Sequence, residues 1–305
     1  MDTVVITGAD GFIGNHLVHY LSKQGVAVCA LVPLRSPVKG RIADIPNTQI
    51  VECDISDWEN IATFLPHNPV AFVHLAWTGV SPKDRHSIKL QTTNIDLSMN
   101  AVRLAAAIHA QRFILPGSTA EYSECGQKIN RSACPSPQSA YGATKISVRY
   151  LCTEQCKELG IPFIYAVITG IYSADRKDNN VIYYAIDQLL QKRCPSFTKL
   201  EQLWDYVYID DVVLALYLII KKGKPDAFYT IGHGDNWALS NYIYIIRDII
   251  DPSLSLNIGG IPYPNNICPS SCVDLRSLQE DTGFEPTVPF EVGIRRVIEK
   301  ILNER

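Results

Sequence analysis

The sequence predicts an α/β fold in which a doubly wound parallel sheet is followed by a second, smaller and less regular domain. Short apolar runs alternate with helical patterns over the first half of the chain, which indicates parallel strands covered by helices. An apolar run at residues 4–6 leads into a glycine turn at 7–14 and then a helical pattern. This order of strand, turn and helix is typical of a Rossmann-like, dinucleotide-binding unit. From about Ile171 proline and glycine become frequent and the alternation ends.

The pattern places the individual elements in order. Strands are expected at residues 4–7, 27–32, 49–53, 71–75, 112–116 and 162–168. Helices are expected between them at about 11–24, 58–65, 93–110 and 141–159, and an apolar stripe predicts a last helix around 294–302. We therefore expect a dinucleotide-binding domain at 1–170, rejoined by about residues 204–230, and a substrate domain at 171–305.

Composition narrows the class of protein. The chain has 305 residues, 47% of them hydrophobic, and a net charge of −3 without a long run of either sign. Nucleic acid and anionic membranes are therefore not expected as partners. The longest apolar run, at 212–220, is about half of the ~20 residues needed to span a bilayer. The chain enters a strand at once, so we expect no signal peptide.

Cysteine usage predicts the compartment and argues against a metal. Nine cysteines are an odd number and are scattered through strand and helix patterns, which favours reduced thiols in a cytoplasm. Cys152 and Cys156 lie four apart, but no nearby histidines complete a zinc-like arrangement. We expect no metal site.

The glycine turn carries the first prediction of a site. Gly8 would allow the tight turn, Gly11 would let the backbone approach a pyrophosphate, and Gly14 would let helix and strand pack closely. Phe12 and Ile13 belong to the same turn. A diphosphate is favoured at the helix N-terminus, where free N–H groups and the helix dipole attract anions.

Two further segments supply groups for proton transfer. Tyr141 and Lys145 lie four apart on one helix face, where an ammonium group would lower the pKa of a buried phenol. Such a tyrosine could exchange a proton with a substrate oxygen. Ser118, or as second choice Thr119, follows a strand and could donate a hydrogen bond to a carbonyl. The alternatives are a surface pair on an amphipathic helix and a hydroxyl that caps a turn.

Other strand ends supply candidate cofactor contacts. The small residues after His74 suit a backbone lying against a cofactor, whereas His74 itself is expected to be structural. Asp54 could bond an adenine amino group or could cap the following helix. The residues expected to contact the cofactor at these two strand ends are Asp54, Ile55, Leu75, Ala76 and Trp77.

Together these residues resemble the extended short-chain dehydrogenase/reductase family, also called the NAD-dependent epimerase/dehydratase family, whose members act on nucleotide sugars. The resemblance covers nearly the whole chain. The family's cofactor turn matches residues 7–14, its Tyr-x-x-x-Lys pair matches Tyr141 and Lys145, and its catalytic hydroxyl falls on Ser118. The resemblance implies that Asn94 and Lys145 contact the cofactor. It also implies a homodimer formed through the helices at 93–110 and 141–159.

Departures from the family pattern are informative about the cofactor. Members that use NAD usually have an acid at the end of the second strand, but residues 31–35 read Leu-Val-Pro-Leu-Arg. Arg35, with Lys39 or Arg41 behind it, could instead face a 2′-phosphate. We expect NADP, with NAD possible; the alternative is that Arg35 is a solvated loop residue.

Departures also bear on the reaction. The family's 4,6-dehydratases carry an Asp-Glu pair after the catalytic threonine, whereas this chain has Thr119 and Ala120 there. Gly170 stands where the family has a substrate-binding asparagine. The chain looks most like the nucleotide-sugar 4-ketoreductases and synthases of deoxyhexose pathways. The resemblance implies an NADP-dependent reductase of a nucleotide-activated 4-keto-6-deoxyhexose. The alternatives are a nucleotide-sugar 4-epimerase with tightly bound NAD and a catalytically silent nucleotide-binding sensor.

Overall fold

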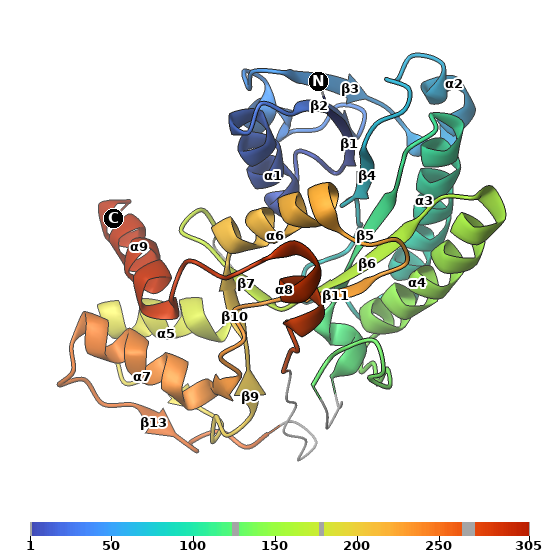
Figure 1. The fold of residues 1–305 in the computed structure, drawn as a ribbon. Coiled ribbons are helices and arrows are strands. Elements are labelled where there is room, and N and C mark those ends of the chain that lie inside the picture. The colour runs from blue at the N-terminus through green and yellow to red at the C-terminus, as the bar shows by residue number, and fades with distance from the viewer. Residues whose placement is uncertain (1, 124–127, 177–179, 264–271, 305) are drawn as a thin grey trace.

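The computed structural model describes residues 2–123, 128–176, 180–263 and 272–304, and within them the chain builds a seven-stranded parallel sheet (Figure 1). Every pairing in this sheet is parallel. The predicted doubly wound fold is therefore confirmed. In spatial order the strands are β11 (Phe228–Ile231), β6 (Phe163–Ile168), β5 (Phe113–Ser118), β4 (Ala71–His74), β1 (Thr3–Thr7), β2 (Ala27–Val32) and β3 (Thr48–Glu52).

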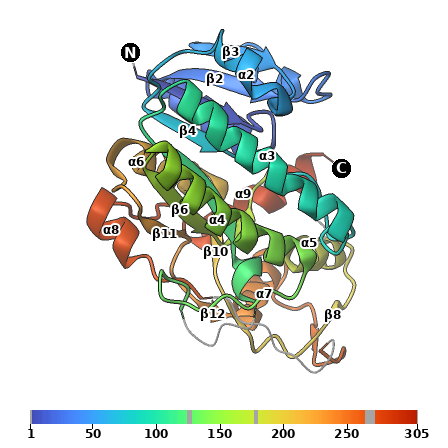
Figure 2. The ribbon, with the colours of Figure 1, turned by 90° about the vertical axis from the view of Figure 1, so that its right-hand side faces the viewer.

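Helices cover both faces of the sheet. On one face α1 (Phe12–Lys23) packs against α6 (Ile209–Lys222). On the other, α3 (Ile88–Ala107) and α4 (Ala140–Leu159) lie side by side (Figure 2). The central strands are consequently buried on both sides, and this explains their almost uninterrupted apolar sequence.

The expected boundaries of α3, α2 (Trp58–Ala62) and β5 were wrong. α3 begins at Ile88 rather than at residue 93, because the Ser87 side chain caps its first turn, and it ends before His109, which has a left-handed φ of 56°. α2 is shorter than expected. β5 continues to Ser118, which pairs with Ile168 of β6, so Ser118 is the last residue of the strand rather than a residue beyond it.

The second lobe is built from α5 (Val181–Leu190), α7 (Leu239–Ile250) and α9 (Phe290–Asn303), which lie to one side of the sheet (Figure 1). Its strands are short pairs: β7 (Gly170–Tyr172) with β10 (Tyr206–Tyr208), β9 (Leu203–Trp204) with β12 (Trp237–Ala238), and β8 (Ser196–Phe197) with β13 (Asn257–Ile258).

Aromatic rings hold the lobe together. Phe290 lies 4.7 Å from Tyr242 and 5.1 Å from Tyr172, and Tyr206 lies 5.0 Å from Tyr242, measured between ring centroids. Offset and edge-to-face rings at such distances stabilise a core beyond their burial.

After the second lobe begins, part of the chain returns to the sheet. α6 packs on α1, and β11 extends the sheet beside β6. Asp211, fully buried in the first turn of α6, accepts hydrogen bonds from the Thr287 N–H and hydroxyl and from the Val288 N–H. The division near residue 170 and the return at about 204–230 stay predictions. No helix within the described ranges is long and apolar enough to cross a membrane.

Candidate active site

The glycine turn between β1 and α1 is shaped to receive an anion. Gly8 has φ +64°, and a Cβ there would lie 2.7 Å from the Ala76 backbone nitrogen. A Cβ on Gly14 would overlap the Gly8 carbonyl oxygen, so helix and turn touch directly. Gly11 is the N-cap of α1 and offers no side-chain cap. The first N–H groups of α1 are therefore not capped by a side chain, and this fits the diphosphate of a dinucleotide cofactor. Phe12 and Ile13 are half-buried in the first turn of α1.

The ends of β2 and β3 meet at the place predicted for the cofactor's ribose. Arg35 is exposed and takes a left-handed φ of 58°, and its backbone N–H donates to Glu52 Oε2 at 3.0 Å. Lys39 pairs with the other oxygen of Glu52. Asp10, from the glycine turn, accepts a hydrogen bond from the Ser36 hydroxyl. The sequence shows no acid at the end of β2, but the fold brings Glu52 to that place from the neighbouring strand.

Asp54 has the capping role that was its alternative. Its Oδ1 accepts from the Ser56 N–H at 3.0 Å and from the Ser56 hydroxyl at 2.8 Å, which lowers the pKa of Asp54. It caps the 3₁₀ turn η2 (Ile55–Asp57), in which Ile55 is buried. The predicted contact of Asp54 with adenine stays a prediction.

The loop after β4 is held from α3. Asn94, fully buried, accepts from the Thr78 N–H at 2.7 Å and donates to the Thr78 carbonyl at 3.0 Å. Gln91 accepts from the Trp77 indole N–H at 3.1 Å and donates to the Gly79 carbonyl at 2.6 Å. In the structure Asn94 thus positions the loop that carries Leu75, Ala76 and Trp77; its predicted contact with the cofactor stays a prediction.

Ser118 ends β5 and begins the 3₁₀ turn η3 (Thr119–Tyr122) through a capping box with Glu121. The Ser118 hydroxyl accepts from the Ala120 N–H at 3.2 Å, and the Glu121 carboxylate accepts from the Ser118 N–H at 2.6 Å. Thr119 lies on the same turn. The capping alternative for Ser118 is therefore realised, and its hydroxyl is also hydrogen-bonded to Tyr141.

α4 brings Tyr141 and Lys145 to this strand end. A Cβ on Gly142 would overlap the Ala120 carbonyl oxygen, so only a glycine lets the helix approach this closely. The Lys145 ammonium donates to the Pro116 carbonyl of β5 at 3.1 Å and lies 3.7 Å from the Trp77 ring centroid. Both side chains of the pair are buried, so the surface alternative is wrong.

The expected direction of the Tyr141 pKa is wrong in this structure. Burial raises it, and the opposing influences are the hydrogen bond with Ser118 and the charges of Arg85 and Arg176. The Lys145 ammonium lies 6.0 Å from the Tyr141 ring centroid and is bonded to Pro116 instead. Arg85 was not singled out from the sequence, yet its guanidinium carbon lies 5.0 Å over the Tyr141 ring.

His74 is structural. It is buried at the end of β4 and is hydrogen-bonded to the Thr7 hydroxyl at 2.7 Å and to the Ser98 hydroxyl at 3.1 Å. Burial, with a smaller contribution from the Lys145 charge, lowers its pKa to about 3. The ring is therefore neutral near pH 7.

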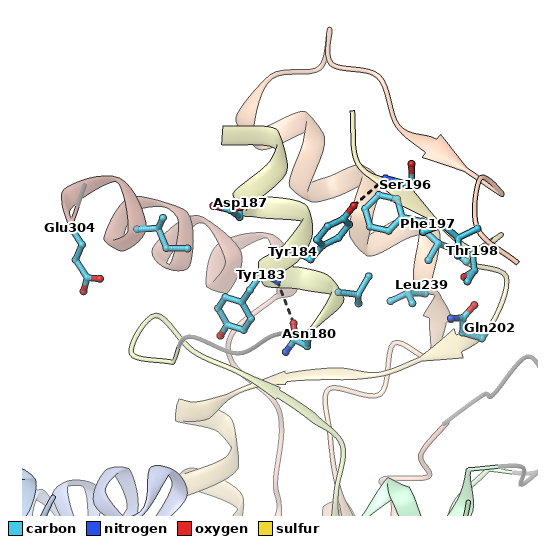
Figure 3. Close-up of a pocket in the computed structure, with 14 residues that line it drawn as sticks. Asn180, Tyr183, Tyr184, Asp187, Ser196, Phe197, Thr198, Gln202, Leu239 and Glu304 are labelled. Carbon is cyan, nitrogen blue, oxygen red and sulfur yellow. Dashed lines mark hydrogen bonds between the residues drawn. The ribbon is translucent and has the colours of Figure 1, made fainter. Parts of the chain in front are cut away.

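The second lobe contains a cavity of about 880 Å³ that none of Ser118, Tyr141 and Lys145 lines. Tyr184 of α5 and Phe197 of β8 give it apolar walls, and Asn180 and Gln202 add amide groups (Figure 3). The size and the mixture of apolar walls with a few polar groups are those of a small-molecule pocket.

Trp204 occupies the place beside Gly170. A Cβ on Gly170 would lie 2.8 Å from the Trp204 indole nitrogen, so the glycine makes room for the indole. That nitrogen is buried and has no hydrogen-bond partner among the described residues. No group of three or more His, Cys, Asp or Glu side chains in the described ranges is arranged to hold a metal ion.

Residues 4–232 match the family described as "NAD dependent epimerase/dehydratase family". CDP-abequose synthase of Salmonella typhimurium is 24% identical to this chain over 309 residues, covering 98% of each. UDP-N-acetylglucosamine 4-epimerase from Methanobrevibacter ruminantium has a TM-score of 0.85 at 20% identity, covering 100% of this chain and 99% of that one. UDP-glucuronic acid 4-epimerase from Bacillus cereus, in complex with UDP-glucuronic acid and NAD, has a TM-score of 0.81 at 22% identity, covering 99% and 100%. The family resemblance and the fold class are both confirmed.

Neutral His74 makes the stability of the fold depend on pH. Its pKa falls from 6.5 to about 3 on folding, so the unfolded chain binds a proton that the folded chain does not. Its contribution is complete above pH 6.5 and is lost as the pH falls towards 3. Between pH 6.5 and about 5 we expect the free energy of unfolding to drop by about 2 kcal/mol from this residue.

Urea unfolding of the protein and of His74→Gln at both pH values measures this contribution. The loss should be smaller in the variant by about the same amount. Equal losses in both proteins would show that burial does not hold His74 in its neutral form.

Proposed function

Since this chain belongs to the NAD-dependent epimerase/dehydratase family, we propose that it is an NADP-dependent reductase of a nucleotide-activated 4-keto-6-deoxyhexose. The observation that carries the proposal is the meeting of Ser118, Tyr141 and Lys145 at the end of β5. The glycine turn is linked to them through Ala76, which touches Gly8, and Trp77, which touches Lys145. The name of the relative CDP-abequose synthase, an enzyme that forms a nucleotide sugar, supports the same class of substrate.

Each residue has a role in the proposed reduction. The nicotinamide cofactor, when bound, supplies the hydride for C4 of the sugar. The Ser118 and Tyr141 hydroxyls polarise the C4 carbonyl, and Tyr141 donates the proton that completes the alcohol. After the transfer Tyr141 is a phenolate, which the positive charges of Arg85 and Arg176 favour; the Lys145 ammonium lies 6.0 Å from the ring centroid. Tyr141 and Lys145 are buried and Ser118 is half-buried, so little water reaches these groups and their electrostatic interactions are strengthened.

The substrate would span the two lobes. The cavity beside α5 supplies apolar walls and amide groups for the nucleotide. Thr119 and Ala120 carry no carboxylate in the place of a dehydratase acid and base. The proposed enzyme therefore does not make its own keto sugar, and a dehydratase has to supply it. A homodimer through α3 and α4 remains part of the proposal, and Tyr150 and Leu151 of α4 are exposed.

A nucleotide-sugar 4-epimerase with NAD is the second candidate. Two features favour it. Glu52 lies beside the backbone of Arg35, where an acid would bond a ribose hydroxyl, and the similar solved structures include a 4-epimerase in complex with NAD. An epimerase keeps its cofactor within the site, whereas a reductase exchanges it at each turnover. The cofactor found in the purified protein therefore separates the two candidates.

The reaction is tested with keto sugars made by a dehydratase. We expect oxidation of NADPH only when a nucleotide-linked 4-keto-6-deoxyhexose is present, because reduction of C4 consumes one hydride and one proton. Absorbance of NADPH and the mass of the product are measured together. A product about two mass units heavier than the keto sugar supports the proposal, since one hydride and one proton add two hydrogens. Isomerisation of an ordinary nucleotide hexose without net cofactor consumption would establish the epimerase instead.

Cofactor choice is tested by titrating NADPH and NADH. Because Arg35 is exposed and solvent screens its charge, a bond from it to a 2′-phosphate is expected to contribute up to about 1.5 kcal/mol, a preference for NADPH of up to about tenfold. Arg35→Ala should remove most of that preference, and Glu52→Gln should increase it by removing a nearby negative charge. Tighter binding of NADH by the unaltered protein contradicts this choice.

The proton donor is tested by Tyr141→Phe. Phenylalanine keeps the buried ring and loses the exchangeable proton, so turnover should fall by about 10²–10⁴ while cofactor affinity stays nearly unchanged. Lys145→Ala should lower both turnover and cofactor affinity, because it also removes the positive charge beside Trp77. If Tyr141→Phe retains more than about a tenth of the rate, another group is the acid.

A further inference from the structure

A buried carboxylate lies directly behind the candidate catalytic residues. Glu121 is fully buried in η3, and its Oε1 accepts from the Ser118 N–H at 2.6 Å and from the Tyr165 hydroxyl at 2.7 Å. Its Oε2 is also buried and has no hydrogen-bond partner within the described residues. Burying an ionised carboxylate in this position costs folding free energy unless a positive charge compensates it.

The compensating charges come from α4. Lys145 and Arg149 lie one turn apart on this helix, and the Lys145 ammonium is itself buried. Arg149 donates to the Tyr122 hydroxyl at 2.9 Å, and its guanidinium carbon lies 5.2 Å over the ring of Tyr165, which is bonded to Glu121. Carboxylate and ammonium groups are thus enclosed in the same layer between α4 and the sheet.

We propose that Glu121 is a positioning residue for the reaction proposed above. Its carboxylate fixes the Ser118 end of β5 through the Ser118 N–H, and its negative charge keeps buried Lys145 protonated beside Tyr141. The chemical consequence rests on the proposed function, whereas the electrostatic coupling between the two groups does not.

The pKa directions agree with this arrangement. Burial lowers the pKa of Lys145 to about 8, and the Glu121 charge opposes that fall. Burial raises the pKa of Glu121, against which act the hydrogen bonds from Tyr165 and Ser118 and the charges of Lys145 and Arg149.

Other ionisable groups around the pair do not supply the negative charge. Burial lowers the pKa of His74 and raises those of Cys152, Tyr165 and Tyr141, so all four are neutral near pH 7. Among the described groups whose charge acts on the pKa of Lys145, Glu121 is the one with a carboxylate. The ionisable or charged groups that interact with one member of the pair are His74 (β4), Tyr141, Arg149 and Cys152 (α4) and Tyr165 (β6). Tyr122 (η3) acts on Tyr165, and Arg85 (the loop after β4) and Arg176 (the loop after β7) act on Tyr141.

The first experiment measures the charge of Lys145 without using activity. Protein carrying lysine labelled with ¹³C at the ε position is titrated by NMR, and the Lys145 signal is assigned by its loss in Lys145→Arg. Glu121→Gln keeps an oxygen acceptor for the Ser118 N–H but removes the charge. We expect it to lower the pKa of Lys145 by about one unit or more, and Glu121→Asp to restore part of the difference.

The matched control is another buried carboxylate, Asp211, which bonds Thr287 and Val288 and does not act on Lys145. Asp211→Asn should leave the Lys145 titration unchanged. In the kinetic experiment, the alkaline limb of the kcat profile should move to lower pH in Glu121→Gln by the same interval, and should not move in Asp211→Asn.

A second measurement covers the outcome in which Glu121→Gln fails to fold. Charge coupling is reciprocal, so Lys145→Gln should raise the pKa of Glu121, followed through ¹³Cδ-labelled glutamate. If Glu121→Gln lowers only the unfolding midpoint, or if neither titration responds to the other residue, Glu121 is only a cap and the proposal is overturned. If the protein turns over no nucleotide sugar, the proposed function fails, while the two titrations still decide the role of Glu121.

Discussion

The close approach of α4 to the end of β5 is the constraint on which the candidate site depends. Gly142 lies against the Ala120 carbonyl, and the Lys145 ammonium donates a hydrogen bond to the carbonyl of Pro116, near the end of β5. These two contacts set the height and rotation of the helix. Tyr141 then meets the Ser118 hydroxyl, although the two residues are far apart in the chain. A side chain at 142 would push the helix outward and separate the pair.

Burial determines how the ionisable groups of this region behave. Transfer out of water disfavours the charged form of each group, and neighbouring charges and hydrogen bonds decide which group keeps its charge. His74 has only hydroxyl partners and becomes neutral. The Glu121 charge opposes the fall in the pKa of Lys145, and the Lys145 charge opposes the rise in the pKa of Glu121. The same buried layer thus holds a neutral histidine, a carboxyl and an ammonium group that favour each other's charged form, and a phenol with a raised pKa.

The opposite end of the cofactor region is solvated and less constrained. Arg35, Lys39 and Glu52 are at the surface, where each charge is screened and the net value of an ion pair is small. In the proposed enzyme, the choice of cofactor would depend on a balance between Arg35, in the loop after β2, and Glu52, at the end of β3. Close packing therefore fixes the positions of Tyr141 and Lys145, whereas the proposed choice between NADP and NAD would depend on modest electrostatic differences.

The sequence by itself determined the sheet, the glycine turn and the tyrosine–lysine pair, because each is a local pattern: apolar runs, glycines at set spacings, and two residues one helical turn apart. It contained a further local signal in Ser118-Thr-Ala-Glu121, the spacing of a capping box, which would have indicated Glu121. Only the tertiary structure placed Glu52 beside Arg35, Arg85 over Tyr141, and Gln91 and Asn94 against the loop after β4. Only it showed that burial raises the pKa of Tyr141 against the hydrogen bond with Ser118 and the charges of Arg85 and Arg176. These features depend on which distant segments meet and how much water remains between them, and no spacing along the chain records either quantity.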